Sequence, residues 1–194
     1  MKKSTISLLA GAMLLAAAPF LSAQAPVAKA EVPILLTSCG QSPGVGMISV
    51  ILRKVGVAYD LAPLAAPADL KVKPYKTLII VMGASLKGMG AAGIAIEDEL
   101  KRASTLIDEA RKLKIKIIGA HVEGMKRRAQ GAEAGDTTDE QTIDTVAVKS
   151  DILLVWKDGN GDGRFTAIAT AKNLPLIEFE KQLDMVKEFE KIFK

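Results

Sequence analysis

The 194-residue sequence contains few of the residues on which several classes of protein depend. It has one cysteine, Cys39, and one histidine, His121. A single thiol cannot form an internal disulfide, so packing must stabilise the fold, and one histidine with one cysteine excludes the usual zinc sets. Aromatic residues make up only 4% of the chain. Because sugars and single-stranded bases are bound by several exposed rings, polysaccharide and nucleic-acid partners are not expected.

The N-terminal segment has the pattern of a secretory signal peptide. Two lysines precede an apolar stretch over residues 6–21, and small residues follow at 22–25 in an A-x-A arrangement. The stretch is shorter than the roughly 18 residues of a membrane span. We therefore expect residues 1–25 to be cleaved, with a second candidate cleavage site at 28–30. The protein is then exported to the periplasm or the extracellular space, without a stable membrane anchor.

The remaining chain, residues 31–194, is predicted to form a single α/β domain. Cleavage removes two lysines and no acidic residue, so the net charge falls from +4 to +2. This balance gives no global sign of nucleic-acid binding. The length is sufficient for one sizeable core, and no internal repeat or low-complexity tract divides it. The sequence gives no oligomeric state.

Short apolar runs alternate with helical stripes along this domain. The runs at 32–36, 77–82 and 115–120 are typical of strands buried on both faces of a sheet. Apolar residues at spacings of three and four over 96–113 predict a long helix with one face against that sheet. We therefore expect a three-layer α/β fold with a mostly parallel sheet, flavodoxin-like or Rossmann-like, in strand order 2-1-3-4-5 with a sixth strand at an edge. The side chains predicted to be buried in it are Ile34, Leu36, Ile79, Val81, Ile117 and Leu154.

Two loops stand where such a sheet is expected to bind a ligand. In open parallel sheets this place lies beyond the carboxyl ends of the strands, where the strand order reverses. Loops 37–44 and 83–93 follow the first and third strands, are rich in small and hydroxyl residues, and lead into helices whose N-termini attract anions. Lys87 would add a positive charge. The sequence thus predicts a site for a small anionic ligand, lined by Ser38, Gln41, Ser42, Ser85, Lys87, Gly88, Gly90, His121 and Glu123.

Other interpretations of these loops stay open. The glycines could serve only to pack the turns against neighbouring helices. Residues 88–93 match G-x-G-x-x-G, but the match follows the third strand and lacks the acidic residue of a dinucleotide site, so no nucleotide cofactor is expected. A hydrolase or transferase would use Ser85 with Lys87, or His121 with Glu123. A non-catalytic interaction module is the remaining alternative.

Residues 158–165 resemble the first half of a calcium-binding loop. Asp158, Asn160 and Asp162 supply oxygens at positions 1, 3 and 5, and a glycine stands at position 6. Position 12 requires a bidentate glutamate and is Ala169. The expectation is a weak calcium site or none, and no other cofactor.

Three segments together resemble a known family. They are TSCGQS (37–42), GASLKGMGAAG (83–93) and HVEG (121–124), and the similarity covers most of residues 32–179. In these segments the chain is similar to an uncharacterised family of exported bacterial proteins, domain of unknown function 6305. The resemblance implies export and one α/β domain, and it implies no activity.

Overall fold

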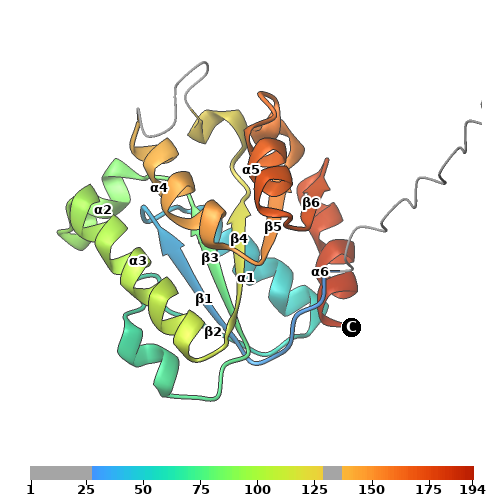
Figure 1. Ribbon diagram of the computed structural model, residues 1–194, viewed down its shortest axis with the longest axis horizontal. Helices are drawn as coiled ribbons and strands as arrows, with labels where there is room; N and C mark the ends of the chain where they lie inside the picture. The colour runs from blue at the N-terminus through green and yellow to red at the C-terminus, as the bar shows by residue number, and fades with distance from the viewer. Residues whose placement is uncertain (1–27, 129–136) are drawn as a thin grey trace, which may run out of the picture.

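The computed structural model describes residues 28–128 and 137–194. Six parallel strands form one sheet in the order β2-β1-β3-β4-β5-β6 (Figure 1). The strands are β1 (Ile34–Cys39), β2 (Tyr59–Leu61), β3 (Thr77–Met82), β4 (Lys116–His121), β5 (Ile152–Trp156) and β6 (Leu176–Phe179). The α-helices are α1 (Gly44–Val55), α2 (Leu86–Ala92), α3 (Ile96–Lys112), α4 (Thr138–Val146), α5 (Arg164–Lys172) and α6 (Met185–Phe193). The 3-10 helices are η1 (Pro67–Lys71), η2 (Gly124–Arg127), η3 (Ala147–Lys149), η4 (Lys157–Asn160) and η5 (Gln182–Asp184).

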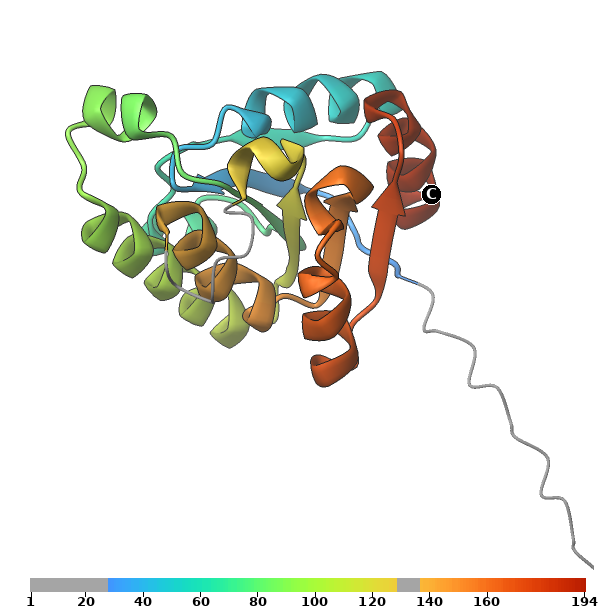
Figure 2. The same cartoon turned by 90° about the horizontal axis from the view of Figure 1, so that it is seen from above.

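Helices cover both faces of the sheet and give the molecule three layers (Figure 2). Successive side chains of a strand point to opposite faces, so β3 contributes Leu78 and Ile80 to one core and Ile79 and Val81 to the other. The first core is completed by α3, α4 and α5, and the second by α1 and α6. None of the described helices is both long and apolar enough to cross a membrane.

The predicted architecture is confirmed. The strand order agrees, all six strands are parallel, and the six side chains predicted to be buried are fully inaccessible. The long helix predicted over 96–113 is α3. These features depend on apolar periodicity, which reports directly on burial. The predicted signal peptide, residues 1–25, lies outside the described residues.

Helix α2 is a feature that the sequence pattern did not predict, because two of its seven residues are glycines and glycine is a poor helix former. Ser85 begins it by accepting a hydrogen bond from the Gly88 N–H at 3.1 Å. The T-x-x-Q pattern at 138–141 predicts a capping box in which Thr138 is the N-cap of α4, but the observed N-cap lies one residue earlier. Thr137 is the N-cap and accepts from the Glu140 N–H at 3.3 Å.

Candidate functional site

The two loops predicted to form a site lie side by side. β1 and β3 pair in parallel up to Cys39 and Met82, so the loops that follow begin at the same edge of the sheet. The Ser85 N–H donates to the Gly40 carbonyl at 2.7 Å. Gly40 has φ +90°, and a Cβ there would lie 2.5 Å from the Gly83 carbonyl oxygen. Only glycine permits this close approach of the two loops.

Backbone N–H groups of both loops are already bonded to carboxylates from other elements. Glu99 Oε1, from α3, accepts from the Gly40 N–H at 2.9 Å. Asp139 Oδ1, from α4, accepts from the Ala84 N–H at 2.6 Å. Neither loop contains an acidic residue, so both carboxylates come from helices that the sequence analysis did not place at this site. In this arrangement these two amides are not free to bind an external anion.

Glu99 is fully buried and forms an ion pair with Arg102, with 2.8 Å between Oε2 and Nε. Arg102 also donates to the carbonyls of Ser38 and Ala65, each at 2.6 Å. Burial alone would raise the pKa of Glu99. The hydrogen bonds and charge of Arg102, together with the hydrogen bonds from Gly40 and Gln41, outweigh burial and hold that pKa below its usual value. Glu99 is therefore ionised at neutral pH, and with Arg102 it fixes loop 37–44.

Two of the predicted ligand-binding side chains have partners within the protein. The buried Ser38 Oγ donates to the Pro63 carbonyl at 3.1 Å. Gln41 Nε2 donates to Glu99 Oε1 at 3.0 Å and lies 3.4 Å from the same Pro63 carbonyl. Both side chains thus connect loop 37–44 to its surroundings.

Ser42 begins a chain of polar contacts that ends at a pocket. Its buried Oγ accepts from the Gly44 N–H at 3.1 Å and donates to Glu123 Oε2 through a short hydrogen bond. Glu123 Oε1 accepts from Arg127 Nε at 3.3 Å, and Arg127 also donates to the Ala84 carbonyl at 2.6 Å. The structure therefore brings together Ser42 and Glu123, which the sequence placed in one site.

The remaining predicted residues of loop 83–93 lie on α2. Ser85 caps this helix, and Lys87 is exposed. Within the described residues no hydrogen bond joins Ser85 to Lys87. A Cβ at Gly88 would lie 2.9 Å from the Gln41 carbonyl oxygen, so Gly88 packs against the first loop, whereas a Cβ at Gly90 would meet open space.

His121 is fully buried at the end of β4 and lies between two backbone carbonyls. Nδ1 is 3.3 Å from the Met82 oxygen and Nε2 is 3.2 Å from the Gly124 oxygen. Its ring stacks on Phe165 with 5.4 Å between centroids. Burial lowers the pKa of His121, although both carbonyls act in the opposite direction. No hydrogen bond to the Glu123 side chain is found in the part of the chain that the structure describes, so the imidazole ties η2 to β3.

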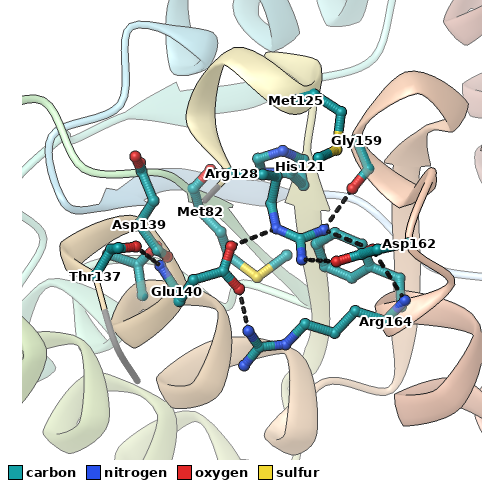
Figure 3. A network of polar contacts seen from close by, with 12 residues as sticks. Met82, His121, Met125, Arg128, Thr137, Asp139, Glu140, Gly159, Asp162 and Arg164 are labelled. Atoms are coloured by element: carbon teal, nitrogen blue, oxygen red, sulfur yellow. Dashed lines mark hydrogen bonds and ion pairs between the residues drawn. The ribbon is translucent and has the colours of Figure 1, made fainter. Parts of the chain in front are cut away.

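Arg128 lies at the centre of a buried ion network beside His121 (Figure 3). Its guanidinium forms ion pairs at 2.6 Å with Glu140 and with Asp162, and it lies over the Phe165 ring. Arg164 forms a second ion pair with Glu140. From the sequence, the basic stretch at 126–128 is expected to be a solvated helix start or loop, with anion binding as the second interpretation. The solvated interpretation is wrong for Arg128, which is buried. The two carboxylates that compensate its charge come from distant segments, so local sequence could not reveal them.

The three predicted calcium ligands bond to different parts of the chain. Asp158 Oδ2 accepts from the Met125 N–H at 2.9 Å, and Asp162 is paired with Arg128. Asn160 Oδ1 accepts from the Phe165 N–H at 2.8 Å. In residues 28–128 and 137–194 no group of three or more His, Cys, Asp or Glu could hold a metal ion. In this structure the 158–165 loop therefore joins η2, the Arg128 network and α5.

A pocket of about 480 Å³ opens at the carboxyl ends of β4 and β5. We call it the β4–β5 pocket. It is lined by Met47, Val122, Glu123, Lys126, Arg127, Trp156, Asp158 and Gln182. Of the residues predicted to bind an anionic ligand, only Glu123 lines it. The predicted reversal point lies between β1 and β3, whereas the pocket lies at the next two strands of the sheet, β4 and β5.

Both carboxylates of the pocket have partners in the protein. Glu123 accepts from Ser42 and Arg127, and Asp158 accepts from the Met125 N–H. Lys126 is exposed and forms no ion pair with any described residue. The pocket therefore presents the Lys126 ammonium beside the apolar surface of Trp156 and its neighbours, together with the Asp158 carboxylate.

No curated protein matches the chain. Among solved structures, similarity is found to a psychrotrophic esterase from Pseudoalteromonas sp., with TM-score 0.36 and 11% identity over 75% of this chain and 76% of that chain. A GDSL-like lipase from Bacteroides thetaiotaomicron gives TM-score 0.31 and 12% identity over 75% and 66%. A GDP-L-fucose synthetase from Naegleria fowleri gives TM-score 0.38 and 9% identity over 84% of this chain, which spans 52% of that protein.

At TM-scores this low, none of these likenesses carries an argument about activity. The chain also matches a sequence family. A family model described as a domain of unknown function (DUF6305) covers residues 31–193, and the chain therefore belongs to this family.

Proposed function

We propose that this protein is an exported module that binds a small anionic molecule in the β4–β5 pocket. The observation that carries the proposal is the exposed Lys126 ammonium at a pocket of about 480 Å³, within the size range of small-molecule sites. Glu123 is paired with Arg127, whereas Lys126 forms no ion pair with any described residue, so its ammonium is available to an anion. The Asp158 carboxylate also lines the pocket, where it accepts from the neutral Met125 N–H.

The lining also indicates the kind of anion. Trp156 Nε1 donates to the Glu180 carbonyl at 3.0 Å, which fixes the indole beside the pocket. Met47 and Val122 add further apolar surface. A phosphate or carboxylate attached to an apolar or aromatic group would contact Lys126 with its charge and this surface with its remainder.

Binding without catalysis is the function that the geometry supports best. In the predicted pair of His121 with Glu123, the imidazole is buried and both of its nitrogens lie against backbone carbonyls. In the predicted pair of Ser85 with Lys87, Ser85 Oγ accepts a hydrogen bond as the N-cap of α2. Ser42 donates to Glu123 but is itself buried, and the sole imidazole of the chain lies elsewhere. Among the described residues no observation favours a hydrolase or transferase over a binding module.

The test is a thermal-shift screen with phosphates and with aliphatic and aromatic carboxylates, followed by titration of the strongest ligand. A ligand that binds only the folded state raises the unfolding midpoint. Lys126→Ala should weaken the affinity at least about tenfold, because a hydrogen bond to a charged group contributes roughly 1.5–3 kcal/mol. The matched control is Lys87→Ala, which removes another exposed lysine, from the site predicted by sequence.

The two variants separate the competing sites. If Lys87→Ala weakens binding and Lys126→Ala does not, the anion binds between loops 37–44 and 83–93, and the β4–β5 pocket is not its site. If no anion shifts the midpoint of the unmodified protein, the proposal is wrong and an interaction module is favoured. Export is tested separately by sequencing the N-terminus of secreted protein, which should begin after residue 25 or residue 30.

A further inference from the structure

A basic face occupies the amino end of the sheet, opposite the β4–β5 pocket. We define it as residues 71–76 (KVKPYK) and 111–116 (RKLKIK), which contain seven basic residues and no acidic residue. All of these side chains are exposed except Tyr75 and Ile115. The Lys116 N–H donates to the Lys76 carbonyl at 3.0 Å, so the two segments are adjacent. In Figure 1 they lie below the sheet, at the end opposite the arrowheads of the strands.

A groove of about 510 Å³ runs between the two segments. Its lining includes the buried apolar residues Leu70, Tyr75 and Ile115. Two aliphatic side chains stand exposed at its borders, Val72 with 72% of its surface accessible and Leu113 with 41%. Each of these is flanked on both sides by basic residues in the sequence, so apolar and cationic groups alternate over the face.

Acidic neighbours compensate only part of this charge. Lys71 pairs with Glu109 at 2.9 Å and Lys73 with Asp60 at 2.7 Å. Arg111 pairs with Asp151 at 2.6 Å, and Glu109 also lies 3.4 Å from Lys112. Lys76 and Lys114 form no ion pair with any residue in the described ranges. The face therefore keeps a positive charge beside exposed apolar groups.

We propose that the basic face docks reversibly on a membrane surface that contains anionic phospholipids. Lipid phosphates would contact the lysines, and Val72 and Leu113 would enter the interfacial layer. A soluble acidic peptide would satisfy the lysines but would leave these two exposed side chains without an apolar partner. Docking at this end leaves the β4–β5 pocket facing away from the membrane, because the pocket lies at the opposite ends of the strands.

The test is sedimentation with vesicles, using the chain from residue 26 onward, which contains all six strands and both cores. Binding is compared between vesicles of phosphatidylcholine alone and vesicles of equal parts phosphatidylcholine and phosphatidylglycerol. We expect binding only to the anionic vesicles, and its loss at high salt, because exposed charges are screened. The variant Lys76→Glu with Lys114→Glu should weaken binding at least about tenfold.

The matched control is Lys172→Glu with Lys187→Glu, which changes the net charge equally on exposed positions of α5 and α6. It should bind like the unmodified protein, and circular dichroism should show that both double variants remain folded. Val72→Ser, which keeps every charge, should also weaken binding. Equal binding to both kinds of vesicle, equal loss in the control, or no binding would each overturn the proposal. Binding to poly-glutamate without binding to vesicles would overturn it in favour of an acidic peptide.

Discussion

Replacing Glu99 with glutamine would preserve the size of a fully buried side chain and remove its charge. The amide oxygen could still accept from the Gly40 N–H, but Arg102 would lose its counterion while only 12% of its side chain is accessible. Removing one partner of a buried ion pair typically costs 3–5 kcal/mol, and the retained hydrogen bond reduces this to about 2–3 kcal/mol. For a domain of this size the unfolding midpoint should fall by roughly 4–12 °C.

Thermal and urea unfolding, followed by circular dichroism, measure this change. The control is Glu97→Gln, which removes an exposed carboxylate from the same helical turn and should cost less than about 1 kcal/mol. Because the pKa of Glu99 is depressed in the folded protein, its contribution is complete above the usual value of 4.5 and is lost as the pH falls through the folded pKa. The difference between Glu99→Gln and the unmodified protein should therefore shrink in acid. A loss no larger than that of the control, or one independent of pH, would refute the role assigned to Glu99.

The structure makes two further predictions about buried titratable groups. Burial lowers the pKa of His121 in the folded protein. As the pH falls below about 6.5, the unfolded chain therefore binds a proton at this imidazole before the folded chain does. The free energy of unfolding should decrease there by up to about 1.4 kcal/mol per pH unit. Unfolding titrations between about pH 6.5 and pH 5 should give a smaller slope for His121→Gln, and equal slopes would show that this imidazole is not held neutral. Burial also raises the pKa of the Cys39 thiol to about 12, so thiol reagents should label Cys39 quickly only after denaturation. Labelling of the native protein at the rate of the unfolded chain would contradict this.

The elements that the sequence predicted well are those whose residues repeat with a regular period. The apolar run of β3 and the stripe of α3 identify both elements, since burial on two faces or one face fixes each pattern. Helix α2 had no such signal, since it is short and glycine-rich and begins only because Ser85 caps it. Right-handed crossovers leave few topologies for parallel strands, and the flavodoxin-like order chosen among them agrees with the structure.

The candidate site was predictable in its position at the carboxyl ends of the strands but not in its contacts. Glu99 carries the clearest missed signal, because it lies four residues before Ala103 on the apolar stripe of α3, where a carboxylate must find partners. Asp139 and Glu140 looked like ordinary acidic residues of a first helical turn. Their hydrogen bonds to Ala84 and Arg128 connect segments far apart in the sequence, and no local pattern encodes such pairs.

The two proposed surfaces differ in how their charges are held, and this difference makes them separable. At the β4–β5 pocket Arg127 is tied to Glu123 and to the Ala84 carbonyl, whereas Lys126 forms no ion pair with any described residue. At the basic face Lys76 and Lys114 are two of several cations, and a membrane would be bound by their sum. Removing Lys126 should therefore impair recognition of one anion and leave vesicle binding intact, whereas reversing Lys76 and Lys114 should do the opposite. If either change affected both anion binding and vesicle binding, the two ends of the sheet would not act independently. The bound anion would then be the headgroup of a membrane lipid.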